Sequence, residues 1–289
     1  MPAGNIRDVR RRVRSVGNIQ QITRAMKFVA ASKLRRAQER IFNARPYANR
    51  MMAVLNSLAT RAEPSHHPLL QDRDGDRTLL ILITADRGLC GAFNSNIIRA
   101  ASRFLREEGR EESTDLTLVG RKALDWFRRR SDSVRREYPN IMTRVDFKYA
   151  QEIARSAVDY YTSDGGSRVY LAYNEFKSVI QQGITVEPLL PIQRLEPEGQ
   201  ETPTDYIYEQ PAPILFDHLL SRHVETQVFR ALLESEAAEH GARMTAMEAA
   251  TKNASEMIEK LTLYMNRLRQ SSITTEIIEV VSGSEALGA

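Results

Sequence analysis

The last quarter of the chain constrains the fold more than any other stretch. From Ile214 to Ala289 the sequence has no proline, the last one being Pro213. A helix from about Asp217 to Val281 would be about 95 Å long at 1.5 Å per residue, and a helix of that length needs a partner helix. Apolar residues recur there in steps of three and four, which places them on one helix face: Val224, Val228, Ala231, Met244, Met247, Ala250 or Thr251, Ala254, Ile258, Leu261, Met265 and Leu268.

The partner helix is predicted at the other end of the chain, in residues 1–62. The two terminal helices, 1–62 and 214–289, would form an antiparallel coiled coil, and a spacing near 3.5 predicts left-handed supercoiling. The predicted register slips near residues 29 to 34 and again near 270. The apolar stripe of the first helix follows the same alternation: Ile6, Val9, Val13, Val16, Ile19, Ile22, Met26, Val29, Leu34, Ala37, Ile41, Ala44, Ala48, Met51, Leu55 and Leu58.

The charges of the two terminal helices are complementary. Residues 1–62 hold 14 lysines and arginines against two acidic residues, whereas residues 214–289 hold 7 against 11. The helices therefore attract each other, and the excess positive charge of the first favours an acidic partner. For any single arginine, a solvated surface position is an equally good interpretation.

Composition limits the class of protein. No run of 18 apolar residues occurs, so no membrane span is expected. The single cysteine, Cys90, excludes an intramolecular disulfide and fits a reducing compartment. The arginine-rich N-terminus lacks the apolar core of a secretory signal, and we interpret it as part of the first helix because the stripe continues to Leu58.

Residues 77–191 are predicted to form a Rossmann-like α/β domain inserted between the helices. Every residue between Thr78 and Thr84 is leucine or isoleucine, and such a continuous apolar run is typical of a parallel strand buried on both faces. Residues 192–213 contain four prolines and are predicted to be a linker or foot. The remaining elements are predicted as helices at 92–108, 122–129 and 151–161 and as strands at 115–119, 168–173 and 179–190.

The stretch from Ala85 to Asn94 lies where doubly wound sheets bind phosphates, between a buried strand and a helix. Gly88 and Gly91 are too close together for a dinucleotide fingerprint, and no lysine–serine pair of a P-loop follows. A tight strand-to-helix turn is the favoured interpretation. A nucleotide-binding enzyme remains a rival hypothesis, although Cys90 has no histidine at a spacing that predicts a catalytic pair.

Metal and nucleic-acid binding are weakly supported. His66 and His67 have no companion ligands at zinc-site spacing, and His218 and His223 are five residues apart, a poor spacing for joint ligation on a helix. The basic first helix has few aromatic residues, and its apolar stripe runs through the basic stretch itself. We predict no catalytic, metal or cofactor site, and a mechanical or scaffolding function.

Three blocks of sequence resemble the γ subunit family of F-type ATP synthases, and the resemblance covers essentially the whole chain. They are IQQITRAMKFVAASK at 19–33, TADRGLCG at 84–91 and RQSSITTEIIEVVSG at 269–283. One departure is Ser284, where the family usually has alanine.

The resemblance implies a non-catalytic central rotor of a proton-translocating synthase. Its partners would be the α and β subunits of the catalytic head, the ε subunit and the membrane c ring, with neither nucleic acid nor direct membrane insertion. It would pass rotation of the c ring to the β subunits and regulate ATPase activity and proton flow. The single cysteine excludes the dithiol switch of chloroplast relatives, so a bacterial form is expected, peripheral on the cytoplasmic face of the inner membrane.

The resemblance also implies two contact regions. The segment from Asp205 to Glu209 would form the foot against the c ring, with Tyr206, Tyr208 and Glu209 as contacts. Contacts with the β and α subunits would be made by seven residues of the two terminal helices: Met26, Lys27, Lys33, Arg269, Gln270, Thr274 and Glu276.

Overall fold

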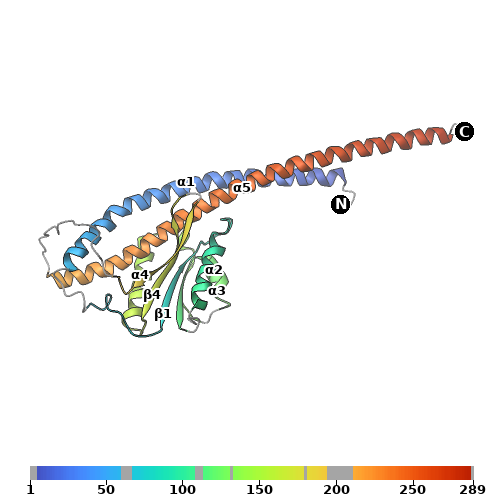
Figure 1. Cartoon of the computed structure of the whole chain (residues 1–289). Coiled ribbons are helices and arrows are strands. Elements are labelled where there is room, and N and C mark those ends of the chain that lie inside the picture. Colours follow the sequence, from blue (N-terminus) through green and yellow to red (C-terminus); the bar gives the residue numbers. More distant parts are fainter. Residues whose placement is uncertain are drawn as a thin grey trace. The chain divides into compact units, whose positions relative to one another are not determined.

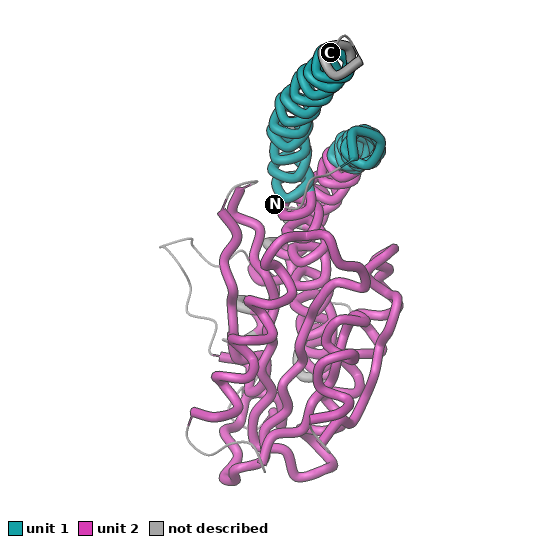
Figure 2. The backbone as a smooth tube through the Cα atoms, turned by 90° about the vertical axis from the view of Figure 1, so that its right-hand side faces the viewer, with its two compact units in different colours: residues 1–29, 244–289 teal, residues 30–243 magenta. Residues whose placement is uncertain are grey.

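Two long helices begin and end the described part of the chain. The computed structural model describes residues 5–59, 67–107, 113–130, 133–178, 181–193 and 211–287. Helix α1 covers Ile6–Ala59, and helix α5 covers Ala212–Leu287, 76 residues without a break (Figure 1). The chain divides into two compact units, Met1–Val29 with Met244–Ala289 and Ala30–Arg243 (Figure 2). Both long helices therefore contribute to each unit.

The larger unit contains a five-stranded sheet in the order β3-β2-β1-β4-β5. Strands β1 (Thr78–Ile83), β2 (Thr114–Val119), β3 (Val134–Tyr138) and β4 (Arg168–Phe176) are parallel, and β5 (Gln182–Leu190) is antiparallel to β4. From β1 the strands are added first on one side, as β2 and β3, and then on the other, as β4, so the strand order changes direction between β1 and β4, as in doubly wound folds. The predicted Rossmann-like α/β domain is confirmed.

Helices cover both faces of the sheet because β1 is apolar on both faces. Leu80 and Leu82 pack against α2 (Phe93–Arg106) and α3 (Arg121–Phe127). The alternate side chains of β1 join a second core with α4 (Phe147–Thr162) and with the segments of α1 and α5 that belong to this unit. The long helices are thus part of the domain's own core.

Strand β3 was not predicted from the sequence. It lies at the edge of the sheet, and most of its side chains are polar and exposed. Charged residues on a short edge strand discourage pairing with other molecules, but they also remove the apolar alternation by which strands are recognised. The 3₁₀ turn η3 (Ile141–Thr143) follows it.

In the smaller unit, α1 and α5 pair through a seam of mixed polarity, in which Val9, Met247 and Ala254 are buried. Three polar contacts join the helices: Gln20 Nε2 to Ser255 Oγ (2.6 Å), Thr23 Oγ1 to Thr251 Oγ1 (2.8 Å) and Lys27 Nζ to Glu248 Oε1 (2.6 Å). Residue numbers rise along α1 as they fall along α5, so the predicted antiparallel arrangement is confirmed.

The predicted apolar stripe is wrong over residues 19 to 29. Ile19, Ile22 and Val29 are exposed, whereas Thr23 is buried. The buried face of α1 continues in regular steps of three and four through residues 9, 13, 16, 20, 23, 27, 30, 34 and 37, so the slip predicted near 29 to 34 does not occur. Polar and small residues occupy this part of the seam, which is why counting apolar residues located it on the wrong face.

The residues that follow β1 and β2 approach each other closely, and this contact supplies a stability test. Gly120 follows β2 with φ 87°, and a Cβ there would lie 2.1 Å from the carbonyl oxygen of Thr84. Gly165 also has a positive φ, 74°, but has nothing within 4 Å of such a Cβ. We expect Gly165→Ala to cost about 1–2 kcal/mol of unfolding free energy, from backbone strain alone. Gly120→Ala adds a backbone clash and should cost more than about 3 kcal/mol.

Urea unfolding of the purified chain, followed by circular dichroism, measures both losses. Equal losses in the two variants would contradict the role given to the Thr84 contact.

Candidate functional site

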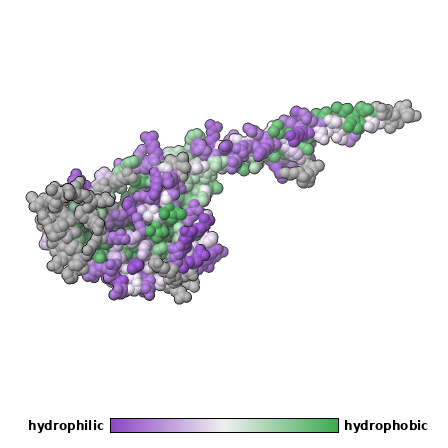
Figure 3. All heavy atoms as spheres, in the orientation of Figure 1, coloured by the Kyte–Doolittle hydropathy of each residue, from purple (hydrophilic) through white to green (hydrophobic). Residues whose placement is uncertain are grey.

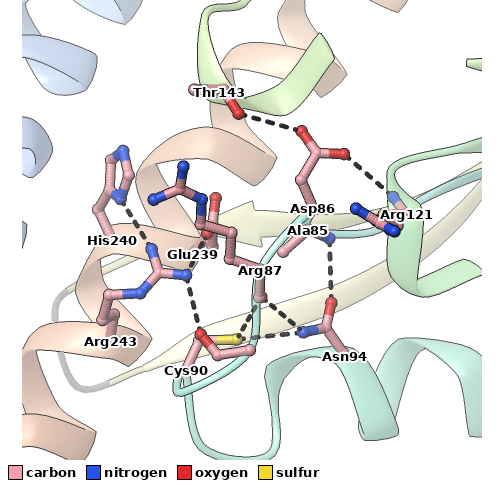
Figure 4. A network of polar contacts seen from close by, with 11 residues as sticks. Ala85, Asp86, Arg87, Cys90, Asn94, Arg121, Thr143, Glu239, His240 and Arg243 are labelled. Carbon is pink, nitrogen blue, oxygen red and sulfur yellow. Dashed lines mark hydrogen bonds and ion pairs between the residues drawn. The ribbon is translucent and has the colours of Figure 1, made fainter. Parts of the chain in front are cut away.

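The predicted turn after β1 is built around the carboxylate of Asp86 (Figure 4). Asp86 Oδ1 accepts hydrogen bonds from the backbone N–H groups of Arg121 (3.0 Å) and Asn140 (2.8 Å). Arg121 begins α3, where a carboxylate satisfies unpaired N–H groups and the helix dipole. One buried side chain therefore joins the turn to α3 and to the end of β3.

Asn94 fixes the other side of the same turn. Its Oδ1 accepts a hydrogen bond from the N–H of Ala85 (3.0 Å), and its Nδ2 lies 3.2 Å from Cys90 Sγ. Leu89, at the tip, has φ 62° and is exposed. Cys90 is buried, and burial raises the pKa of its thiol, the opposite of what an activated nucleophile requires.

Helix α5 reaches the turn through Arg243. Its guanidinium pairs with Glu239 Oε1 (2.6 Å), donates to the carbonyl oxygen of Gly88 (3.1 Å) and contacts His240 Nδ1 (3.4 Å). The side chains of Arg243 and Glu239 are only 12% and 6% exposed. Figure 4 shows this pair beside the turn.

The same helix covers the carboxyl ends of β1 and β4, where doubly wound sheets bind ligands. Ser235 Oγ accepts a hydrogen bond from the N–H of Asn174, at the end of β4 (3.2 Å). Ala238 packs with Ala85, Cys90 and Phe93. Side chains of α5 thus contact β4 and the turn after β1.

Burial changes the ionisation of α5 at this junction. It raises the pKa of Glu239, and Arg243 opposes that rise. Burial, with Arg243 and Lys33 as further causes, lowers the pKa of His240 to about 4, and burial likewise lowers that of His223 to about 4. Both histidines are therefore neutral at pH 7, which lets His240 Nδ1 accept from Arg243.

The structure places the predicted β and α contacts of α1 in both units. Met26 and Lys27 are half-buried in the smaller unit, and Lys27 Nζ is already paired with Glu248. Lys33 is exposed in the larger unit. Lys33 therefore belongs to a different unit from Met26 and Lys27.

The predicted contacts on α5 share one exposed helical segment. Arg269, Gln270, Thr274 and Glu276 are all exposed. Thr274 Oγ1 donates to the backbone carbonyl of Gln270 (2.9 Å), and Glu276 accepts from Ser272 Oγ (3.3 Å), both within the helix. The predicted c-ring contacts Tyr206, Tyr208 and Glu209 lie outside the described residues.

The helices of the smaller unit expose large apolar side chains, visible as green patches near the end of α5 in Figure 3. Ile277 and Val280, for example, are 58% and 72% exposed. We define this set as the outer apolar surface: Ile19, Ile22, Phe28 and Val29 of α1, and Ile273, Ile277, Ile278, Val280 and Val281 of α5.

The described residues contain neither a cluster of metal ligands nor a membrane-spanning helix. Across 5–59, 67–107, 113–130, 133–178, 181–193 and 211–287, no three histidine, cysteine, aspartate or glutamate side chains gather as a metal site would require. Within the same ranges, no helix combines the length and the apolar character needed to cross a membrane.

The sequence analysis missed the residues that join α5 to the domain. Glu239 and Arg243 are four residues apart, the spacing of an ion pair on one helix face, and this signal was available. Such pairs usually lie in solvent, and nothing in the sequence indicates that this one faces the turn after β1.

An antiparallel pair of terminal helices with an inserted doubly wound domain defines a class of coiled-coil proteins, and comparison with known proteins identifies the family. The family model described as ATP synthase matches residues 5–287. An ATP synthase gamma chain of Geobacter sp. (strain M21) is 48% identical over 284 residues, covering 98% of this chain and 99% of the relative. That of Solibacter usitatus (strain Ellin6076) is 50% identical, covering 96% and 98%. The chain belongs to the ATP synthase gamma chain family.

Solved structures agree with this assignment. The central stalk and c-ring structure of Tetrahymena thermophila mitochondrial ATP synthase contains a chain with 29% identity and a TM-score of 0.60, covering 79% of this chain and 99% of that one. A chain of the Euglena gracilis mitochondrial enzyme, with 20% identity, a TM-score of 0.68 and coverage of 98% and 94%, shares the fold.

The buried histidines predict an acid-dependent loss of stability. A histidine with a pKa of 6.5 when unfolded and about 4 when folded binds its proton first in the unfolded chain. Stability is therefore full above pH 6.5 and falls as the pH drops towards 4, by up to ~3 kcal/mol for each such histidine. His240→Gln should lose less unfolding free energy over this interval than the parent. Urea unfolding at several pH values measures it, with exposed His218→Gln as the control. If the unfolding free energies of His240→Gln and the parent fell equally with pH, His240 would not be neutral and buried in the folded chain.

Proposed function

We propose that the chain is the central rotor subunit of a proton-translocating F-type ATP synthase. It would pass rotation of the membrane c ring to the catalytic β subunits, regulate ATPase activity and proton flow, and supply no catalytic group. Membership of the gamma chain family supports this, as does the likeness to a chain of the central stalk and c-ring structure from Tetrahymena thermophila.

One observation carries the proposal: the outer apolar residues are not needed to hold α1 and α5 together. On α1 they lie off the buried face, which runs through Val9, Val13 and Thr23, and on α5 they lie in 269–283, where every residue is exposed. Large exposed apolar surfaces mark sites of interaction with other proteins. A surrounding sleeve of α and β side chains would cover them.

An apolar bearing suits a shaft that turns. Apolar burial is non-directional, so the contact free energy changes little as the shaft takes different angles inside the sleeve. Charged contacts would act as weak guides. The excess positive charge of α1 suits acidic loops on β, and an exposed ion pair contributes only about 0–1 kcal/mol, so it can break at each step.

The remaining contacts follow from the same proposal. Arg269, Gln270, Thr274 and Glu276 would meet β near the end of α5, and Met26, Lys27 and Lys33 would meet acidic loops of the head. Tyr206, Tyr208 and Glu209 would form the foot on the c ring, and ε would bind the α/β domain. The protein would then be peripheral on the cytoplasmic face of a bacterial inner membrane.

Removal of residues 272–289 should uncouple the assembled complex. It deletes the α5 part of the outer apolar surface, while the α/β domain lies in the other unit and should fold normally. We expect ATP-driven proton pumping to fall more than ATP hydrolysis, measured on membrane vesicles by fluorescence quenching and phosphate release. Truncation after Gly283 is the control and should pump normally. Unchanged pumping in the longer truncation would contradict the placement of this surface in the head.

Arg269→Ala should weaken the contact with β. An interface arginine typically contributes about 1–2 kcal/mol, so assembly or turnover should fall about five- to thirtyfold. Arg267→Ala is the matched control, because Arg267 is an exposed arginine two residues earlier and points to a different side of α5. Yield of the purified complex and its hydrolysis rate are the measurements. Normal values for both in Arg269→Ala would remove this residue from the interface.

A further inference from the structure

A rotor has to pass a twisting force between its α/β domain and its shaft, and in this chain both meet within the larger unit. Much of that contact is the apolar core, in which α5 residues such as Leu220 and Val228 lie with side chains of β1. A close-packed core resists sliding because its side chains interlock, although apolar burial itself has no preferred direction. Hydrogen bonds with charged donors fix both distance and angle. The polar contacts between α5 and the domain therefore add directional resistance to rotation.

Arg243 makes a charged contact of this kind from a mostly buried side chain. A second contact, Arg230 to Glu187 Oε1 (2.8 Å), joins α5 to the edge strand β5, but its side chains are 45% and 34% exposed. Solvent screens such a pair and lowers its strength. The side chains of Arg243 and Glu239 are 12% and 6% exposed, and Arg243 donates directly to the carbonyl oxygen of Gly88, an exposed residue of the turn.

The α5 end of this contact is held in one orientation. Glu239, one helical turn earlier, binds Arg243 at 2.6 Å, and His240 Nδ1 contacts the same guanidinium. A planar guanidinium that meets acceptors in three directions has little freedom to rotate. Glu239 thus supports Arg243 and aims it at the turn.

The domain end is equally constrained. The carbonyl of Gly88 precedes Leu89, whose φ is 62°, and the turn is held by Asn94 to β1 and by Asp86 to α3 and Asn140. From Gly88 the backbone leads to Arg87, whose carbonyl oxygen lies 3.5 Å from Asn94 Nδ2, and Asn94 in turn binds the N–H of Ala85 after β1 (Figure 4).

We propose that Arg243, supported by Glu239, is the positioning residue that locks α5 to the α/β domain and carries shear between them as the rotor turns. This inference rests on the proposed function and extends it to a residue outside the predicted contact set. It assigns the turn at 86–91 a mechanical task, as the domain's attachment point on the shaft.

Two variants separate the lock from the charge. Arg243→Lys keeps the positive charge and can pair with Glu239, but a single ammonium cannot also hold the Gly88 carbonyl and His240. Arg243→Gln removes the charge. Arg35→Gln is the matched control, because Arg35 forms an ion pair of the same spacing with Glu39 (3.2 Å) on an exposed face of α1.

The test uses the whole complex, immobilised through its catalytic head, with a bead attached at Ser178→Cys, an exposed position two residues after β4. The angular fluctuation of the bead without ATP reports the stiffness between domain and head. Protons pumped per ATP hydrolysed report coupling. Hydrogen exchange of the amides at 88–91 reports the lock itself, and loss of one hydrogen bond to a charged group should raise it about tenfold or more.

We expect both Arg243 variants to show wider bead fluctuations, faster exchange at 88–91 and fewer protons per ATP, whereas Arg35→Gln matches the parent. A purely structural role would reduce the amount of assembled complex without changing the stiffness of what does assemble. If Arg243→Gln fails to assemble, the bead fluctuation, amide exchange and proton-to-ATP ratio are measured on Arg243→Lys alone.

Normal stiffness and coupling in Arg243→Lys, together with normal exchange, would overturn the lock. The two proposals fail differently. A parent bead that does not rotate with ATP contradicts the rotor function, whereas a rotating bead with unchanged stiffness in the variants contradicts the lock alone.

Discussion

The structure depends on one pairing, that of α5 with α1 in antiparallel directions. A continuous helix of 76 residues cannot bury its apolar face within a small domain, so it needs a second helix along its length. In the larger unit this pair is part of the core that covers one face of the sheet. The α/β domain therefore shares its core with the two helices, and side chains of α5 that contact the sheet fix its position along that helix.

The seam of the smaller unit mixes polar and apolar residues. It contains Thr23 with Thr251 and Gln20 with Ser255 as well as buried Val9, while the large side chains of Ile22 and Phe28 face outward. Polar pairs in a seam specify register at a cost in stability. The proposed sleeve would return that stability by covering the outer residues, so part of this unit's folding free energy would come from its assembly.

Sequence reasoning succeeded where burial on both faces left a continuous apolar run, as at Thr78 to Ile83, and where helices were long and periodic. It failed at β3, whose exposed charged side chains hide its period, and at residues 19 to 29, where polar residues occupy the seam. The turn at Asp86 was located from its place between strand and helix. The role of Arg243 was not, because pairing with a backbone carbonyl 155 positions away leaves no local pattern.

The covering of the carboxyl ends of β1 and β4 by α5 has a further consequence. Ser235 and Ala238 contact the side of the sheet at which doubly wound enzymes bind their ligands, so the helix can be compared with a ligand tethered to its own receptor. A tethered ligand has an effective concentration set by chain connectivity, commonly in the millimolar range, and cannot be diluted away. Doubly wound domains that bind a cofactor exchange it with the solution. In this chain the bound element is part of the same polypeptide, so the contact persists at any protein concentration.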